Sequence, residues 1–123
     1  MSDPKLVHEI LSQILVAAKR IERRFHGINH PDDFLSSDEG IDRMDGICMM
    51  LIAIGESLKN LESITGGEFF SRHPDVDWKG AKGVRDILSH HDFDADPEVL
   101  FFICQKHLPS LVQAIQSIQE HER

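Results

Sequence analysis

Three side chains suited to phosphodiester chemistry lie close together in the sequence, at Arg85, Asp86 and His90. An arginine guanidinium neutralises a phosphate through a planar fork of N–H donors. A histidine titrates near neutral pH, so it can both accept and donate protons. These groups are the ones that a metal-free cleavage of a phosphodiester needs, and they carry most of the functional prediction.

Their spacing suits a helix from about Trp78 to His91. Asp86 and His90 are four residues apart, so the carboxylate could contact the imidazole, fix its tautomer and favour its protonated form. Arg85 and His90 are separated by about 7.5 Å of rise and about 140° of rotation. Both could still reach one phosphate, because arginine is long and the helix is expected to end near His91.

Spacing alone leaves an ordinary interpretation open, because similar runs of Arg, Asp and His occur on solvent-exposed helices. A metal site is not predicted, since His90 and His91 would point about 100° apart on a helix. The alternating acids Asp92, Asp94 and Asp96 lack the later glycine and glutamate of a calcium-binding loop. Turn formation and helix capping account for them, so neither a metal nor a cofactor is expected.

Composition and charge limit the possible partners. The chain has 123 residues and a net charge of −8 with neutral histidines, so bulk electrostatics should not hold nucleic acid tightly. Any RNA contact must come from local basic patches, concentrated in an oligomer. No apolar run approaches the roughly 18 residues of a membrane span, and the N-terminus does not resemble a signal peptide.

The two cysteines, Cys48 and Cys104, fall within apolar helical patterns. They are interpreted as small buried hydrophobic residues in a reducing compartment, rather than as a disulfide. We therefore expect a cytoplasmic protein that forms a single domain over residues 1–123.

The apolar periodicity predicts an all-α fold, an up-and-down bundle of four to five helices. The expected helices span residues 4–26, 39–64, 78–91 and 98–119, with short turns at 31–35 and 68–72. Asp3 should cap the first helix, and Ser37 or Asp38 the second. Pro109 should kink or break the last helix.

Three features leave alternatives open. Gly55, within the second helix, suggests close packing against another helix. Glu56 beside it is expected to be exposed, although a buried, hydrogen-bonded acid is the other possibility. The basic face of the first helix is either a solvated surface or a binding site; it carries Lys19, Arg20, Arg23 and Arg24.

Several segments, in order, resemble the HepT-like ribonuclease toxins of the broader HEPN superfamily. They are IGES at 54–57, DWKG at 77–80 and VRDILSH at 84–90, and the similarity continues through 94–99 into the last helix. The resemblance implies an all-α bundle that dimerises, with the R-x4-H motifs of both protomers facing one cleft. It also implies a metal-independent endoribonuclease whose antitoxin is a minimal nucleotidyltransferase.

On this sequence the motif maps to Arg85 and His90, with Asp86 at the polar position after the arginine. His90 would be the acid/base, Arg85 the phosphate clamp and Asp86 the group that orients His90. A twofold dimer would also bring two copies of Lys79 and Lys82 to the cleft. With His91, these lysines are the predicted RNA-binding residues.

One position departs from the family pattern. Many HepT-like proteins carry R-x4-H-x-Y, where the tyrosine receives AMP from the antitoxin; here the position is Asp92, and the chain contains no tyrosine. An acid beside the cleft should repel RNA phosphate. Three interpretations remain: a natural variant silenced by tight antitoxin binding, a weakened or inactive member, or an engineered substitution that mimics the added charge. The alternative function is a non-catalytic helical module that binds a nucleotidyltransferase.

Overall fold

The computed structural model describes residues 3–90 and 96–121, with the backbone only for residues 85–90. Every regular element in these residues is helical, which confirms the all-α prediction. The long helices are α1 (Pro4–Phe25), α2 (Asp38–Thr65), α4 (Trp78–His90) and α6 (Leu108–His121). The shorter elements are η1 (Pro31–Phe34), α3 (Glu68–Arg72), α5 (Pro97–Phe102) and the π-helical turn η2 (Ile103–His107).

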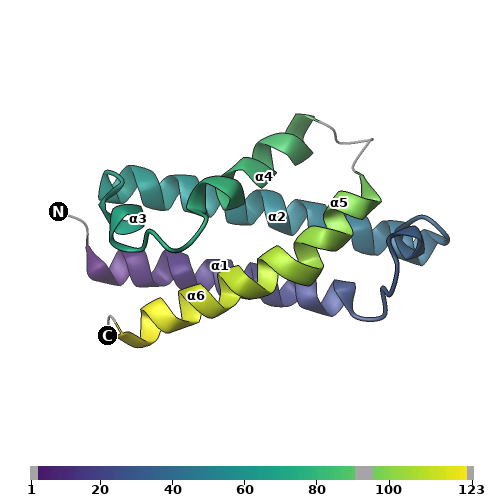
Figure 1. Ribbon diagram of the computed structural model, residues 1–123, viewed down its shortest axis with the longest axis horizontal. Coiled ribbons are helices and arrows are strands. Elements are labelled where there is room, and N and C mark those ends of the chain that lie inside the picture. Colours follow the sequence, from purple (N-terminus) through teal and green to yellow (C-terminus); the bar gives the residue numbers. More distant parts are fainter. Residues whose placement is uncertain (1–2, 91–95, 122–123) are drawn as a thin grey trace.

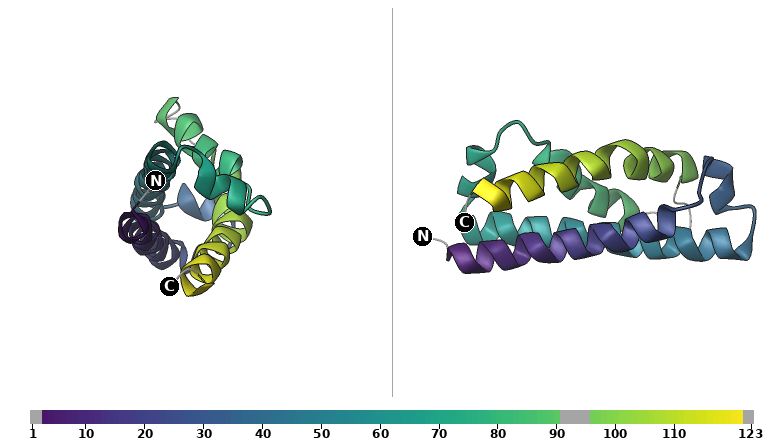
Figure 2. Two further views of the ribbon diagram at one scale, coloured as in Figure 1. Left: turned by 90° about the vertical axis from the view of Figure 1, so that its left-hand side faces the viewer. Right: turned by 90° about the horizontal axis from the view of Figure 1, so that it is seen from below.

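The long helices run alternately up and down, as the sequence predicted (Figure 1). Helix α2 returns along α1, α4 runs back over α2, and the continuous α5–η2–α6 segment closes the bundle against α1. The end-on view in Figure 2 shows these elements surrounding a common centre, and both chain termini lie at one end of the bundle.

Apolar side chains from all these helices meet in one core. Helix α1 contributes a stripe at the expected spacing, including Ile10, Ile14 and Ile21, and α2 contributes Leu58 and Leu61. Burying a side chain of this size stabilises the fold by roughly 1.5–3 kcal/mol relative to leaving it exposed. The core therefore fixes the positions of the helices around it, among them the helix that carries the predicted motif.

Local sequence signals set the helix ends. The Asp3 carboxylate accepts the Lys5 N–H at 2.9 Å, and Ser37 rather than Asp38 caps α2, because its Oγ accepts the Gly40 N–H at 3.0 Å. At the other end of α2, Gly66 and Gly67 adopt left-handed backbone angles, φ 63° and 82°. Glycine adopts these angles without steric cost, which explains the abrupt turn into α3.

The interruption expected near Pro109 lies one turn before it, in η2. The Leu108 N–H bonds to the Ile103 carbonyl, five residues back instead of four. A proline has no N–H to donate, and its ring crowds the carbonyl four residues earlier. For Pro109 that carbonyl belongs to Gln105. Gln105 lies within the π turn, where the regular α-helical hydrogen bonds are already interrupted.

The structure confirms that Glu56 is exposed and Cys104 buried, but Cys48, also expected to be buried, is only half-buried. Gly55 is buried as well. On the basic face of α1 only Arg24 is half-buried, while the other three cations are exposed. Cys104 is a buried free cysteine, and burial, with a smaller contribution from the nearby Cys48, raises the pKa of its thiol to about 12.

Gly40 lies where α2 packs against η1. A Cβ at this position would lie 2.2 Å from the carbonyl oxygen of Asp33 and 2.9 Å from that of Phe34. Because both atoms belong to the backbone, Gly40→Ala should destabilise the fold by about 2 kcal/mol. Gly83→Ala is the matched control: a Cβ there meets nothing within 4 Å, so it should stabilise by about 0.5–1 kcal/mol. Urea unfolding measures both, and equal effects would contradict this account.

The Asp33 carboxylate holds the start of η1. Its Oδ2 accepts the N–H groups of Asn29 at 2.8 Å and His30 at 3.0 Å, and these hydrogen bonds keep the pKa of Asp33 below its ordinary 3.8. Because folding lowers the pKa of Asp33, its ionised carboxylate raises the free energy of unfolding. This contribution is present above the pKa of the unfolded state and is lost as the pH falls through the pKa of the folded state. Asp33→Asn should therefore lower the urea midpoint near neutral pH, and the difference should shrink in acid below that folded pKa. Asp32→Asn is the control, and a pH-independent loss in Asp33→Asn would refute this.

Candidate active site on helix α4

Helix α4 starts at a firmly capped position. The Asp77 carboxylate accepts the Gly80 N–H at 2.9 Å and so caps the helix. A Cβ on Gly80 would lie 2.3 Å from Asp77 Oδ2, so the absence of a side chain there leaves room for the capping carboxylate. The first turn of the motif helix is thus fixed by its own sequence.

Trp78 anchors this start to the core. Its side chain is 5% exposed, and its indole N–H donates to the His73 carbonyl at 2.9 Å. The ring stacks on Phe70 at 4.9 Å between centroids and also contacts Phe69 at 5.6 Å. Helix α3 and the following loop therefore provide an aromatic base that sets the direction in which α4 leaves the bundle.

Two lysines on α4 were predicted to contact RNA, and they have different surroundings. Lys79 is exposed. The Lys82 ammonium pairs with the Glu62 carboxylate of α2 at 2.7 Å and lies over the Phe70 ring, 5.5 Å from its centroid. This pair ties α4 to α2, so Lys82 can contribute charge to RNA only in competition with Glu62.

The backbone of α4 places the three motif positions as the spacing predicted. The helix is continuous to His90, and the expected end at His91 lies outside the described residues. Position 86 therefore lies about one turn before position 90. In Figures 1 and 2 the last turns of α4 stand away from the centre of the bundle, at its outer edge. The side chains of Arg85, Asp86 and His90, together with the whole of His91 and Asp92, lie outside the described residues.

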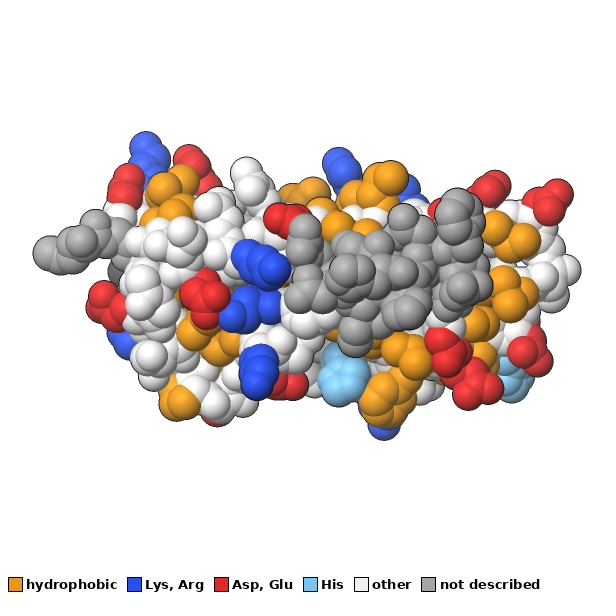
Figure 3. All heavy atoms as spheres, turned by 90° about the horizontal axis from the view of Figure 1, so that it is seen from above, with side chains coloured by type: hydrophobic (Ala, Val, Ile, Leu, Met, Phe, Trp, Pro, Cys, Tyr) orange, Lys and Arg blue, Asp and Glu red, His pale blue; other side chains and the backbone are white. Residues whose placement is uncertain are grey.

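The surface around α4 combines positive and negative side chains. Figure 3 looks onto this face, where several Lys and Arg side chains lie together near the middle, with Asp and Glu side chains beside them and toward both ends. A local basic patch within an acidic chain is the arrangement that the net charge of −8 requires of an RNA-binding surface.

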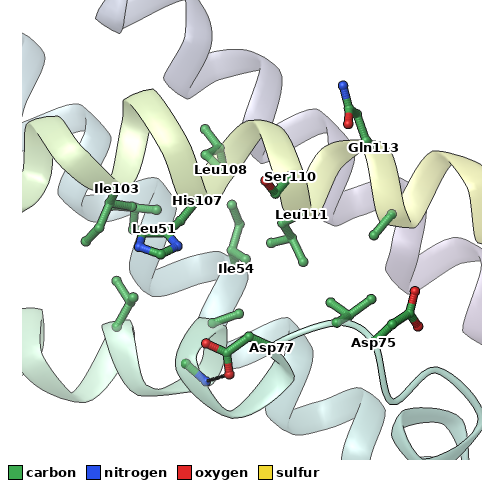
Figure 4. Close-up of a pocket in the computed structure, with 15 residues that line it drawn as sticks. Leu51, Ile54, Asp75, Asp77, Ile103, His107, Leu108, Ser110, Leu111 and Gln113 are labelled. Atoms are coloured by element: carbon green, nitrogen blue, oxygen red, sulfur yellow. Dashed lines mark hydrogen bonds between the residues drawn. The ribbon is translucent and has the colours of Figure 1, made fainter.

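An open groove between α4 and α6 is a feature that the sequence did not predict. It has a volume of about 710 Å³ and lies above Leu51 and Ile54 of α2 (Figure 4). Its α4 wall consists of Gly80, Ala81 and Val84, and its other wall belongs to η2 and α6. Small residues on both walls, such as Ala81 and Ala114, are the sequence signal that could have indicated it, because they leave two neighbouring helices without side chains to fill the space between them.

Two further properties concern only the part of the chain that the structure describes. No cluster of three or more His, Cys, Asp or Glu side chains that could hold a metal ion is found among the described side chains. None of the described helices has the length and apolar character needed to cross a membrane.

The similarity of the chain to known proteins covers most of its length. The family model described as Ribonuclease HepT-like matches residues 14–118. The chain belongs to the HepT-like ribonuclease family. The resemblance inferred from the motifs is thereby confirmed, and the matched region contains all of helix α4.

Two curated relatives carry ribonuclease names. "Putative RNase MJ0127" of Methanocaldococcus jannaschii is 31% identical over 87 residues, which are 71% of this chain and 66% of that protein. "Putative RNase TTE0752" of Caldanaerobacter subterraneus subsp. tengcongensis is 30% identical over 113 residues, 92% of this chain and 94% of that protein. This HepT-like chain thus spans about two thirds of the first relative and nearly all of the second. No solved structure gives a significant match.

Proposed function

We propose that this HepT-like protein is a metal-independent endoribonuclease, the toxin of a toxin–antitoxin pair, which a minimal nucleotidyltransferase neutralises. The observation that carries the proposal is the family match across α4, the helix on which the backbone holds positions 85, 86 and 90 at the outer edge of the bundle. An edge position leaves this segment open to a large polymeric substrate and to a second protomer.

The proposed active site is a cleft shared by two protomers. Exposed apolar side chains on helix α2 support dimerisation. Ile41 is 37% and Met49 66% exposed. Covering these side chains with a second copy removes apolar surface from water. Twofold symmetry then supplies two histidines and two arginines to one site.

The chemistry proceeds through the RNA's own 2′-hydroxyl. The His90 imidazole of one protomer takes the 2′-hydroxyl proton as the oxygen attacks the adjacent phosphorus. The two Arg85 guanidiniums stabilise the pentacoordinate phosphorane. The P–O5′ bond breaks when the second His90, in its protonated form, gives its proton to the leaving 5′-oxygen. The products are a 2′,3′-cyclic phosphate and a 5′-hydroxyl, and Asp86 orients His90 throughout.

The direct test incubates the purified protein with RNA in EDTA. Wild type should cleave, and Asp92→Tyr should cleave about five times faster, because the substitution removes a like charge worth roughly 1 kcal/mol near the scissile phosphate. The cut ends should carry a 2′,3′-cyclic phosphate and a 5′-hydroxyl. Such fragments cannot be joined by an RNA ligase until their ends are repaired, and this identifies them. Cleavage that disappears in EDTA would reject the metal-independent mechanism.

A second candidate function rests on Asp92 and on the net charge of −8. In this alternative the chain is a non-catalytic module that binds the nucleotidyltransferase. The same experiment separates the two: RNA left intact by wild type and by Asp92→Tyr, together with a stable complex with a nucleotidyltransferase encoded beside it, selects the module. Cleavage only after Asp92→Tyr would mean that the active centre is present but disabled.

A further inference from the structure

The groove between α4 and α6 is built as a slot beside the motif segment. Ala81 and Val84 of α4 line it, and Val84 directly precedes the motif position 85. The α2 side chains form an apolar floor and Leu108 and Leu111 an apolar wall. We propose that this groove receives a nucleobase of the RNA next to the cleaved phosphate; the inference rests on the proposed ribonuclease function and adds a subsite to it.

The lining changes in character along the groove. Figure 4 shows the His107 imidazole at one end, near Leu51, and the Asp75 carboxylate at the other end. His107 is exposed and makes an edge-on contact with Phe102, 5.1 Å between ring centroids. The end with His107 is the one nearer to the C-terminal half of α4. The His107 imidazole therefore lies on the side of the cleaved phosphate, and the exposed Asp75 carboxylate lies at the opposite end.

This distribution fits a base better than a phosphate. A nucleobase has two flat faces and a polar edge, and proteins bind the unstacked bases of single-stranded RNA by contacts to both. Apolar walls match its faces, whereas the Asp75 carboxylate would repel a phosphate. As an acceptor, Asp75 favours bases that carry an exocyclic amino group, which are adenine, cytosine and guanine, over uracil.

The distance from the groove to the motif also suits a neighbouring nucleotide. His90 is the sixth residue after Val84 on the helix, a rise of about 9 Å. One extended nucleotide covers a comparable length, since consecutive backbone units of single-stranded RNA can splay apart. The base in the groove is therefore expected to belong to a nucleotide within one or two positions of the cleavage point.

The test blocks the groove and measures RNA binding and cleavage separately. Ala114→Trp places an indole in the groove, whereas Gln116→Trp places one on the exposed side of the same helix, since Gln116 does not line the groove. Fluorescently labelled single-stranded oligonucleotides of each base are titrated in EDTA, with His90→Ala as background to prevent cleavage. Ala114→Trp should weaken binding of oligo(A) and oligo(C) by roughly tenfold, the size of a lost charge-assisted contact, and Gln116→Trp should not.

Asp75→Ala gives the second arm. The variant should reduce about tenfold the ratio of the affinity for oligo(A) or oligo(C) to that for oligo(U). Asp45→Ala, which replaces an exposed acid of α2, should leave this ratio unchanged. Circular dichroism and urea unfolding check that each pair of variants folds equally. In the active background, kcat/KM for RNAs that differ only beside the cleavage point should show the same pattern.

Two outcomes would overturn the inference while leaving the ribonuclease proposal standing. In one, wild type cleaves RNA but Ala114→Trp and Gln116→Trp bind and cleave alike. In the other, Ala114→Trp leaves RNA binding unchanged and weakens only the complex with the nucleotidyltransferase, so that the groove docks a protein segment. If wild type neither binds nor cleaves RNA, the proposed function and the base subsite both fail.

Discussion

Replacing His90 by alanine is expected to lower the rate of RNA cleavage in EDTA by about two to four orders of magnitude. In the proposed mechanism, the variant removes the group that accepts the 2′-hydroxyl proton and, from the other protomer, delivers one to the 5′-oxygen. Binding of RNA should change little, so the loss should appear in kcat rather than in KM. Single-turnover cleavage of an end-labelled RNA, with the cut position mapped for wild type, measures the effect.

The neighbouring histidine provides a matched control. His91→Ala removes the same side chain one position later, where a helix would point it about 100° away. Because His91 is predicted to contact RNA rather than to transfer protons, its loss should raise KM by a few-fold, in line with one weak contact, and leave kcat nearly unchanged. Size-exclusion chromatography should show the same oligomer for both variants and wild type. Full activity in His90→Ala would reject the assignment of acid and base.

The fold was predictable because its signals are local. The start of α1 and both ends of α2 are set by residues within three positions of them. Asp3 and Ser37 accept hydrogen bonds from N–H groups in the first turns of α1 and α2, and Gly66–Gly67 ends α2. Apolar residues at intervals of three and four then determine which face of each helix is buried. The helix bounds from the sequence accordingly differ from those observed by one residue or two.

What could not be predicted depends on contacts between distant residues. Lys82 and Glu62 are 20 positions apart, and no periodicity indicates that one lysine of the predicted RNA surface pairs with an acid of α2. The same holds for the stacking of Phe70 on Trp78, which sets the direction of α4. The groove is a further case, because it exists only through the relative placement of α4 and α6.

The candidate site likewise has one part that the sequence predicts and one part that it does not. The motif at positions 85, 86 and 90 is visible in the sequence because three informative residue types fall on one short helix. His107 gave no such signal: it lies 17 positions after His90, in a turn whose π form the sequence did not predict. Its proximity to α4 becomes visible only when the last helix is folded back along the bundle.

The shared cleft makes a prediction that no single variant can test. When one part of wild type is unfolded and refolded with nine parts of His90→Ala, subunits of a symmetric dimer pair at random, and only about 1 dimer in 100 contains two wild-type copies. If cleavage needs one imidazole from each protomer, activity per wild-type subunit should fall about tenfold. If each protomer carries a complete site, mixed dimers remain active and the activity per wild-type subunit is unchanged.

A control shows whether the loss of activity comes from mixed dimers or only from dilution of wild type. In this parallel refolding an unrelated carrier protein replaces His90→Ala. Activity per wild-type subunit should then stay constant, because no mixed dimer forms. The dependence on composition is also informative: activity should follow the square of the wild-type fraction for a site built by two copies, and the first power for a site built by one. A first-power dependence would contradict the shared cleft while leaving His90 as a catalytic residue, so the geometry of the dimer and the chemistry of the motif can fail independently.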